Sequence, residues 1–214
     1  MVKTIIDKMN TTIERVHVLD VYERIANSFD DTRYSVWNFV KEFLRTKEHL
    51  FGIDIGCGNG KNMIHVNMIG VDVCKNLLKS AKRNNPNNTL CLSNCMDLPF
   101  RDNIFDYAIG ISVYHHLSTE ERRTDAVCEM IRVMKHGADG LINFWSHENQ
   151  TRRKLDIGDN YVSWKSEHNA RCYYIYNEKT LMSFMNNVIR LTNILVTNIF
   201  NEQGNWVVIF VKPP

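Results

Sequence analysis

The residues best suited to hold a ligand are two acids and three glycines. The segment FGIDIGCGNG places Asp54 two residues before the first of three alternating glycines, Gly56, Gly58 and Gly60. Glycines let the backbone turn where a Cβ would clash, and they let a ligand approach the main chain. A second apolar run, MIGVD, ends in Asp72, and a carboxylate there suits a ribose, whose two hydroxyls donate to it. The pattern predicts a nucleoside-type cofactor across the carboxyl ends of two adjacent parallel strands.

The glycine spacing distinguishes between cofactors of this type. A dinucleotide-binding loop follows G-x-G-x-x-G, with an acid about 20 residues on, so that a pyrophosphate sits on a helix N-terminus. Here the spacing is G-x-G-x-G, and Asp54 places a negative charge where a pyrophosphate would be repelled. The same charge attracts an ammonium or a sulfonium, so the sequence favours S-adenosylmethionine. The alternative is a glycine turn that binds nothing.

Length and composition indicate one globular domain. The chain has 214 residues, of which 44% are hydrophobic, and its net charge is only +2. That charge neither requires nor excludes a nucleic-acid partner. We expect a single domain over 1–214, with a helical N-terminal extension over about 1–47 and a polar, irregular insertion on the substrate side over about 146–176.

The sequence contains no signal for export or for a membrane. MVKTIIDKMN has no apolar stretch long enough for a signal peptide, and no run is long enough to cross a bilayer. The six cysteines form no C-x-x-C motif, so we expect reduced thiols and no metal site built by this chain alone. We expect a cytoplasmic protein.

Helical and strand patterns alternate along the chain, which predicts an α/β fold with a parallel sheet. Expected helices cover 16–29, 37–44, 118–134 and 178–188, and a crossover helix marked by Leu77, Leu78 and Ala81 ends before the turn-rich NNPNN. Expected strands cover 50–55, 68–72, 89–93, 105–112, 141–145, 194–200 and 205–212. We expect Ser118 and Glu121 to form a capping box and His136-Gly137 to end that helix. The last two strands, joined by NEQG, predict a hairpin that leaves one strand antiparallel.

Longer motifs carry a resemblance to a known family. The segments are VYERIANSFDDTRYSVWNFVKEFL, GIDIGCGNGK, NCMDLPFRDNIFDYAIGISVYHHLSTEERR, FWSHEN, NYVSWK, RCYYIYNEKTL and GNWVVIF. Through them the chain resembles class I methyltransferases, and more narrowly the fungal-type tRNA wobble-uridine carboxymethyl methyltransferases. The resemblance implies a Rossmann-like, seven-stranded, mostly parallel sheet with strand order 3-2-1-4-5-7-6, helices on both faces and a C-terminal antiparallel hairpin.

The resemblance also implies an activity and partners. Members of the family methylate the carboxylate of 5-carboxymethyluridine at the tRNA wobble position, using S-adenosylmethionine, and work with a small zinc-binding activator. Three departures concern loop geometry. The segment between Gly60 and Asp72 is short, His136-Gly137 replaces a proline–glycine pair, and Ala138 replaces the next glycine.

The substrate carboxylate is an anion at neutral pH, so its methylation requires alignment more than a strong base. We predict that Arg33 holds this carboxylate, because its planar fork matches one; the alternative is a surface arginine paired with Asp30 or Asp31. His115 and His116 follow the fourth strand, where one of them is expected to bind the substrate; the alternative is that they only order the loop.

The cofactor side is assigned partly by resemblance. Asp97 is expected to bind the adenine amino group, with Leu98 beside it, while Ile111 lines the pocket and Tyr22 covers the methionine end. A capping role for Asp97 and a core role for Tyr22 are the alternatives. The predicted cofactor-binding set is Tyr22, Asp54, Gly56, Gly58, Gly60, Asp72, Val73, Asp97, Leu98 and Ile111.

RNA and protein contacts are predicted on other elements. A basic rim for the anticodon stem comprises Arg122, Arg123, Arg152, Arg153 and Lys154, and Tyr114 either stacks on a base or packs in the core. The third strand is an apolar edge of the sheet, which invites pairing with the activator. Its residues are Thr89, Leu90, Cys91, Leu92 and Ser93.

Two other functions fit the same features. One is a class I methyltransferase that acts on a small molecule, which transfer to small acids rather than to tRNA would reveal. The other is a non-catalytic protein that binds S-adenosylmethionine or RNA, which retained cofactor affinity without transfer to any tRNA would reveal.

Overall fold

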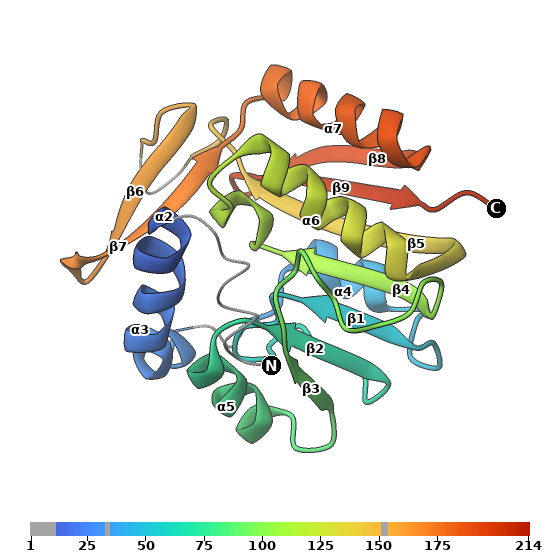
Figure 1. Cartoon of the computed structure of the whole chain (residues 1–214), viewed down its shortest axis with the longest axis horizontal. Coiled ribbons are helices and arrows are strands. Elements are labelled where there is room, and N and C mark those ends of the chain that lie inside the picture. Colours follow the sequence, from blue (N-terminus) through green and yellow to red (C-terminus); the bar gives the residue numbers. More distant parts are fainter. Residues whose placement is uncertain (1–11, 33–34, 151–153) are drawn as a thin grey trace.

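A seven-stranded sheet forms the centre of the structure (Figure 1), a computed structural model that describes residues 12–32, 35–150 and 154–214. Its strands are β1 (Gly52–Ile55), β2 (Met68–Asp72), β3 (Thr89–Leu92), β4 (Phe105–Ile111), β5 (Met134–Trp145), β8 (Leu195–Glu202) and β9 (Asn205–Val211). The order across the sheet is β3-β2-β1-β4-β5-β9-β8. β1 to β5 run parallel, whereas β9 is antiparallel to both of its neighbours. The predicted fold class and strand order are confirmed.

Helices cover both faces of this sheet. α6 (Glu120–Val133) and α7 (Glu178–Thr192) lie against one face, where Val127, Met130 and Phe184 are fully buried with the apolar sheet residues. α4 (Asn38–Leu44) covers the other face, with Val40 and Leu44 in its own apolar cluster. The buried core on both sides holds the central strands rigidly, so their carboxyl ends form a fixed platform.

The N-terminal helix lies beyond those carboxyl ends. It consists of α2 (Thr12–Glu14), a π-helical turn η1 (Arg15–Leu19) and α3 (Asp20–Asp30), and it packs beside α5 (Lys75–Asn84). Figure 1 shows this helix at the left, next to a small second sheet. The location therefore places helix side chains over the edge where a ligand binds in open α/β sheets.

That second sheet corrects one prediction. Much of 146–176 was expected to be irregular, but β6 (Gly158–Trp164) and β7 (Ser166–Ile175) form an antiparallel hairpin. Val162, Tyr173 and Ile175 are buried beneath it in an apolar cluster with Trp145 and Leu155. Only Val162 is buried on β6, and Arg171, Cys172 and Tyr173 are buried in succession on β7, so neither strand shows the strict apolar–polar alternation by which a half-buried strand is recognised in a sequence.

The start and end of α6 also differ from expectation. Its N-cap is Thr119, whose side chain accepts from the Arg122 amide, and not Ser118. Ser118 instead donates both its amide and its hydroxyl to Glu14. The helix ends at Val133, because β5 begins at once and Met134 pairs with Phe105. Tertiary partners outweigh the local capping signal here.

Candidate functional site

The glycine loop wraps around the end of β2. The amides of Gly56 and Cys57 donate to the carbonyl of Val71, at 2.7 and 2.9 Å. Gly56 has φ +72°, and a Cβ there would lie 2.5 Å from Val113, so only glycine fits. A Cβ on Gly58 would meet no atom within 4 Å, so its backbone borders open space. The loop therefore leaves its main chain open at Gly58, where the sequence predicts a ligand.

Asp72 connects this loop to the end of β2. One carboxylate oxygen accepts from the Gly58 amide and the other from the Cys74 amide, both at 2.8 Å. Burial raises the pKa of Asp72 to about 6, although the two amides oppose that shift. Each oxygen keeps a lone pair for a further donor, such as a ribose hydroxyl.

Asp54 is a fully buried acid that lacks a partner. Its side chain is 0% exposed, and neither carboxylate oxygen has a hydrogen-bond partner within the described ranges. Burial, and secondarily the charge of Asp72, raise the pKa of Asp54 well above its usual range. A buried carboxylate is stable when a cation or hydrogen-bond donor satisfies it. This orphaned acid and the open space at Gly58 fit a cofactor with nucleoside and cationic ends.

The N-terminal helix holds the loop from the other side, through contacts that the sequence does not reveal. Asp30 accepts from the side-chain amides of Asn59 and Asn84 at 2.7 and 3.0 Å, which fixes the loop against α5. Glu23 accepts from the Lys75 and Asn76 amides and so caps α5. These acids follow no motif, and only tertiary packing places them there.

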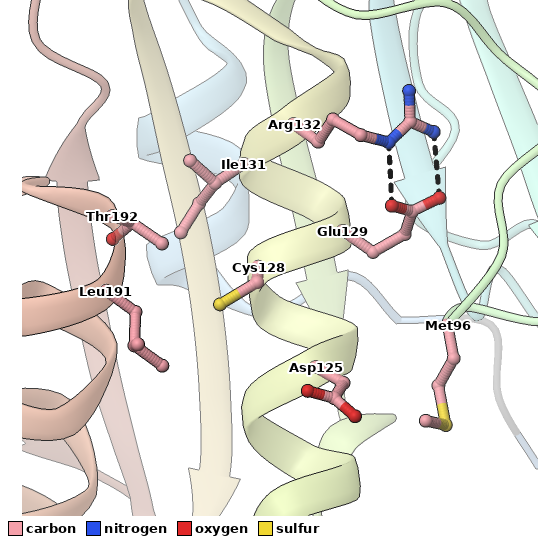
Figure 2. Close-up of a pocket in the computed structure, with 8 residues that line it drawn as sticks. All are labelled: Met96, Asp125, Cys128, Glu129, Ile131, Arg132, Leu191 and Thr192. Carbon is pink, nitrogen blue, oxygen red and sulfur yellow. Dashed lines mark hydrogen bonds and ion pairs between the residues drawn. The ribbon is translucent and has the colours of Figure 1, made fainter.

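The predicted adenine side is a turn after β3. Asp97 is exposed in that turn, and Leu98 beside it is buried. Glu129 accepts from the Leu98 amide at 2.7 Å, while Arg132 donates to the carbonyls of Leu98 and Phe100. Figure 2 shows the Glu129–Arg132 pair on α6. This pair holds the turn in place, and the contact of Asp97 with adenine stays a prediction.

A surface hollow of about 420 Å³ lies beside that pair. Figure 2 shows Met96 on one side of α6 and Leu191 and Thr192 on the other. Asp125 and Cys128 also line it, but no residue of the glycine loop and neither Asp54 nor Asp72 does. The hollow is therefore separate from the predicted cofactor site.

The two histidines lie at the predicted edge, but inside the protein. Burial lowers the pKa of His116 to about 3 and that of His115 well below its usual range, so both are neutral. His116 Nδ1 donates to the Cys172 carbonyl at 2.7 Å, so its Nε2 accepts from the Tyr22 hydroxyl at 3.0 Å. His115 Nδ1 accepts from the Trp145 amide at 3.3 Å. His116 thus has both ring nitrogens engaged and orders the edge.

Three predicted RNA contacts are corrected by the structure. Tyr114 is 0% exposed, and its hydroxyl donates to Met130 Sδ at 3.1 Å, so it packs in the core and does not stack on a base. Arg123 is 3% exposed, donates to the Leu117 carbonyl and lies 4.0 Å from the Tyr174 ring centroid. Arg122 forms a bidentate ion pair with buried Glu14 at 2.7 Å. Arg122 and Arg123 therefore anchor the fold.

The remaining predicted site residues lie in different parts of the structure. Val73 is half-buried and packs in one cluster with Tyr22, and Ile111 is buried at the end of β4. Lys154 is exposed, as a phosphate contact requires. Arg33, Arg152 and Arg153 lie outside the described residues. β3 lies at the edge of the sheet, where the described residues pair with it only through β2.

The described residues show neither a metal cluster nor a membrane-spanning helix. No group of three or more His, Cys, Asp or Glu side chains in the described ranges is placed to hold a metal ion. None of the helices described is both long and apolar enough to cross a bilayer.

Comparison of the whole chain with known proteins agrees with the site. A family model described as a methyltransferase domain matches residues 53–142. The chain is 38% identical over 164 residues to the tRNA (carboxymethyluridine(34)-5-O)-methyltransferase of Schizosaccharomyces pombe, a match that covers 73% of this chain and 71% of that protein. It is 37% identical to the protein of that name from Saccharomyces cerevisiae, with 66% of this chain and 52% of that protein covered.

Solved structures share the fold at low sequence identity. A SAM-dependent methyltransferase from Methanosarcina mazei has a TM-score of 0.65 at 17% identity, with 84% of this chain and 99% of that chain covered. A putative methyltransferase from Haloferax volcanii, solved in complex with the Trm112 methyltransferase activator, has a TM-score of 0.68 at 14% identity, with 92% and 98% covered.

The site, the fold and the relatives agree on the cofactor. An acid before the glycine loop, an acid at the end of β2 and a class I sheet are common features of enzymes that use S-adenosylmethionine, which is therefore the cofactor of this chain. The identity to the S. pombe protein, over most of both chains, is far above what the fold alone requires. The chain belongs to the tRNA (carboxymethyluridine(34)-5-O)-methyltransferase family.

Proposed function

We propose that this chain methylates the carboxylate of 5-carboxymethyluridine at the wobble position of tRNA and so forms the methyl ester. The observation that carries the proposal is the 38% identity to the S. pombe enzyme of that name. Bound S-adenosylmethionine supplies a methyl group on a sulfonium sulfur, which leaves as a neutral thioether. A substrate carboxylate oxygen forms the new C–O bond as the C–S bond breaks, so no proton is transferred.

The chemistry of the site supports an anionic nucleophile. The ring lone pair of His116 already accepts from the Tyr22 hydroxyl and that of His115 from the Trp145 amide, and burial lowers the pKa of both rings, so neither is a ready proton acceptor. A hydroxyl or amine nucleophile would need a base to take its proton. A carboxylate is ionised at neutral pH and needs none. The described residues thus serve to bind, to orient and to exclude water.

Further parts of the proposal concern residues and partners. The sequence predicts Arg33, which lies outside the described residues, as the ligand of the substrate carboxylate, and Arg152, Arg153 and Lys154 stay our predicted phosphate contacts. This function implies action in the cytoplasm, on the anticodon stem-loop of tRNA.

We also propose that a small zinc-binding activator pairs with the edge of β3 to form a heterodimer. An apolar edge strand favours pairing with another chain, and the H. volcanii relative in fold was solved with the Trm112 methyltransferase activator. The Ser93 amide donates to the Asp72 carbonyl, so the amide of Leu92 points away from β2. Leu92→Pro should therefore block the activator and keep the β2–β3 ladder, whereas undiminished activator binding would contradict the proposal.

Release of S-adenosylhomocysteine tests the substrate class. The chain, with its activator, is supplied in parallel with tRNA that carries 5-carboxymethyluridine, with the same tRNA bearing unmodified uridine, and with small carboxylic acids. We expect release only with the first. Release with the small acids alone would assign a small-molecule methyltransferase, and cofactor binding without release in any arm would assign a non-catalytic protein.

A further inference from the structure

A buried arginine without an acidic partner lies at the substrate side of the site. Arg171 of β7 is 2% exposed. Its Nη1 donates to the Tyr22 hydroxyl at 3.2 Å, and its Nε has no acceptor within the described ranges. No described acid forms an ion pair with it. Buried charges in proteins are normally paired, because they lose their hydration. The surroundings of Arg171 are therefore suited to an anion that is not part of this chain.

Aromatic rings hold this cation without neutralising it. The guanidinium carbon lies 5.1 Å from the ring centroid of Trp164, 5.2 Å from Tyr173 and 5.6 Å from Tyr22. At these distances a cation is attracted to the ring faces, but its charge stays available. We call Arg171, Tyr22, Trp164 and Tyr173 the arginine box. The two histidines against Tyr173 are neutral, so they add no competing charge.

A second buried donor lies on the same ring. His115 accepts from the Trp145 amide through Nδ1, so its proton is on Nε2, which has no partner in the described part of the chain. The ring centroids of His115 and Tyr173 are 5.1 Å apart. Two buried N–H donors without acceptors, on residues that share one neighbouring ring, are rare in folded proteins. Both are suited to an acceptor that carries negative charge.

The arginine box adjoins the cofactor edge. Tyr22 packs in one apolar cluster with Phe29 and Val73, and Val73 directly follows Asp72. The Tyr22 hydroxyl also donates to His116, which follows β4. Tyr22, Phe29 and Trp164 are only half-buried, so solvent reaches the outer rings. A base that displaces these side chains would meet the guanidinium beside the predicted ribose site.

We propose that Arg171 binds the carboxylate of the substrate nucleotide, while the rings of the arginine box contact its base. The inference rests on the proposed function and deepens it, because it assigns to Arg171 the role that the sequence predicts for Arg33. A guanidinium offers two parallel N–H donors that match the two oxygens of a carboxylate. Methylation removes the negative charge, so the product ester loses this attraction.

Binding of two RNAs that differ at one group tests the proposal without turnover. The full chain, saturated with S-adenosylhomocysteine, is titrated with anticodon stem-loops that carry either 5-carboxymethyluridine or its neutral amide, 5-carbamoylmethyluridine. The unmodified chain should prefer the acid by about 10- to 100-fold, as expected for hydrogen bonds to a charged group. Arg171→Met should bind both RNAs with the amide's affinity. Equal affinities in the unmodified chain would overturn the proposal.

Matched variants separate this role from general attraction of RNA. Arg24 is an exposed arginine that donates to the His168 carbonyl of the same hairpin, and Arg24→Gln should leave the acid-to-amide ratio unchanged. If Arg171→Met fails to bind S-adenosylhomocysteine, Arg171→Lys decides, because lysine keeps the charge and loses the fork. An unchanged ratio in Arg171→Lys, or a ratio abolished only by Arg33→Ala, would overturn the proposal.

The same RNAs and variants distinguish a failure of this inference from a failure of the proposed function. Methyl transfer to the acid stem-loop with a ratio insensitive to Arg171 would overturn the inference and leave the function intact. A ratio that depends on Arg171, without methyl transfer, would overturn the function and support the binding site.

Discussion

The Tyr22 hydroxyl donates to Nε2 of His116 across 3.0 Å, although the two residues are 94 positions apart in the chain. His116 in turn donates from Nδ1 to the Cys172 carbonyl, and Arg171 donates to the Tyr22 oxygen. One hydrogen-bonded chain thus joins α3, the end of β4 and β7. It fixes the protonation of His116 and holds the N-terminal helix over the carboxyl edge of the sheet.

Tyr22→Phe should lower the free energy of unfolding by about 1–3 kcal/mol, because it leaves a buried acceptor on His116 and a buried donor on Arg171 without partners. Urea denaturation measures the change. Tyr161→Phe is the matched control, since Tyr161 is 53% exposed, and its effect should be within about 0.5 kcal/mol. Equal effects of the two substitutions would show that the hydrogen-bonded chain contributes nothing.

Acid should destabilise the protein through His116. Burial lowers its pKa from 6.5 to about 3, so between these pH values the unfolded state binds more protons than the folded state. The stabilisation is complete above pH 6.5 and is lost as the pH falls towards about 3. His116→Gln should reduce the slope of unfolding free energy against pH in this window; part should remain, because burial also depresses the pKa of His115.

A substitution at an exposed histidine is the control for the slope of unfolding free energy against pH. His49 is exposed, and His49→Gln should leave the slope as it is in the unmodified chain. A stability that does not change between pH 6.5 and pH 4 would show that His116 is not buried as a neutral ring.

Local patterns predicted most of the sheet. β1 is buried at all four positions from Gly52 to Ile55, where apolar residues flank Asp54, and the glycines that follow have positive φ. Such features depend on a few adjacent residues, so the sequence alone predicts them. The β6–β7 hairpin was missed because its strands lack a regular apolar–polar alternation, and buried residues such as Val162 and Tyr173 pack with Trp145 from another strand.

Affinity for S-adenosylmethionine should rise as the pH is raised through about 6, the pKa of Asp72. Ribose hydroxyls donate to the ionised carboxylate, so binding favours the charged form and releases a proton. In the absence of cofactor, the free energy of unfolding depends on pH in the opposite direction. The raised pKa of Asp72 stabilises the folded protein below pH 3.8, and this contribution is lost as the pH rises through about 6.

Calorimetry from pH 5 to pH 8 measures this dependence. Asp72→Asn should weaken binding by about tenfold or more at pH 8 and flatten its pH dependence. Asp159→Asn, at an exposed position on β6, should change neither. A pH-independent affinity in the unmodified chain would remove Asp72 from the cofactor site.

Arg132→Ala should weaken cofactor binding by about tenfold, although Arg132 itself is not a predicted contact of the cofactor. Arg132 and Glu129 hold the carbonyl and amide of Leu98, and their loss releases the turn that carries Asp97. The matched control is Arg45→Ala, which breaks an exposed pair with Glu42 at the same spacing. That change should cost less than about 0.5 kcal/mol of stability and leave affinity unchanged. Equal effects would indicate that the turn does not contact the cofactor.

The site was only partly predictable, for a physical reason. Asp54, Gly58 and Asp72 lie on two consecutive strands and the loop after the first of them, so the pattern of adjacent parallel strands brings them to one edge of the sheet. Arg123 was predicted on a basic surface and Tyr114 either against a base or in the core, yet both are buried by partners from elsewhere in the chain, Tyr174 and Met130. Arg171 shows the converse: its lack of an acidic partner is visible only in three dimensions.

The central claim is most directly tested by the mass of the wobble nucleoside. The chain and its activator are incubated with S-adenosylmethionine that carries a deuterated methyl group and with tRNA bearing 5-carboxymethyluridine, and the tRNA is digested to nucleosides. The account predicts the methyl ester of that nucleoside, heavier than its unlabelled form by three deuterium-for-hydrogen replacements. Recovery of unchanged 5-carboxymethyluridine, from a sample shown by calorimetry to bind the cofactor, would contradict it.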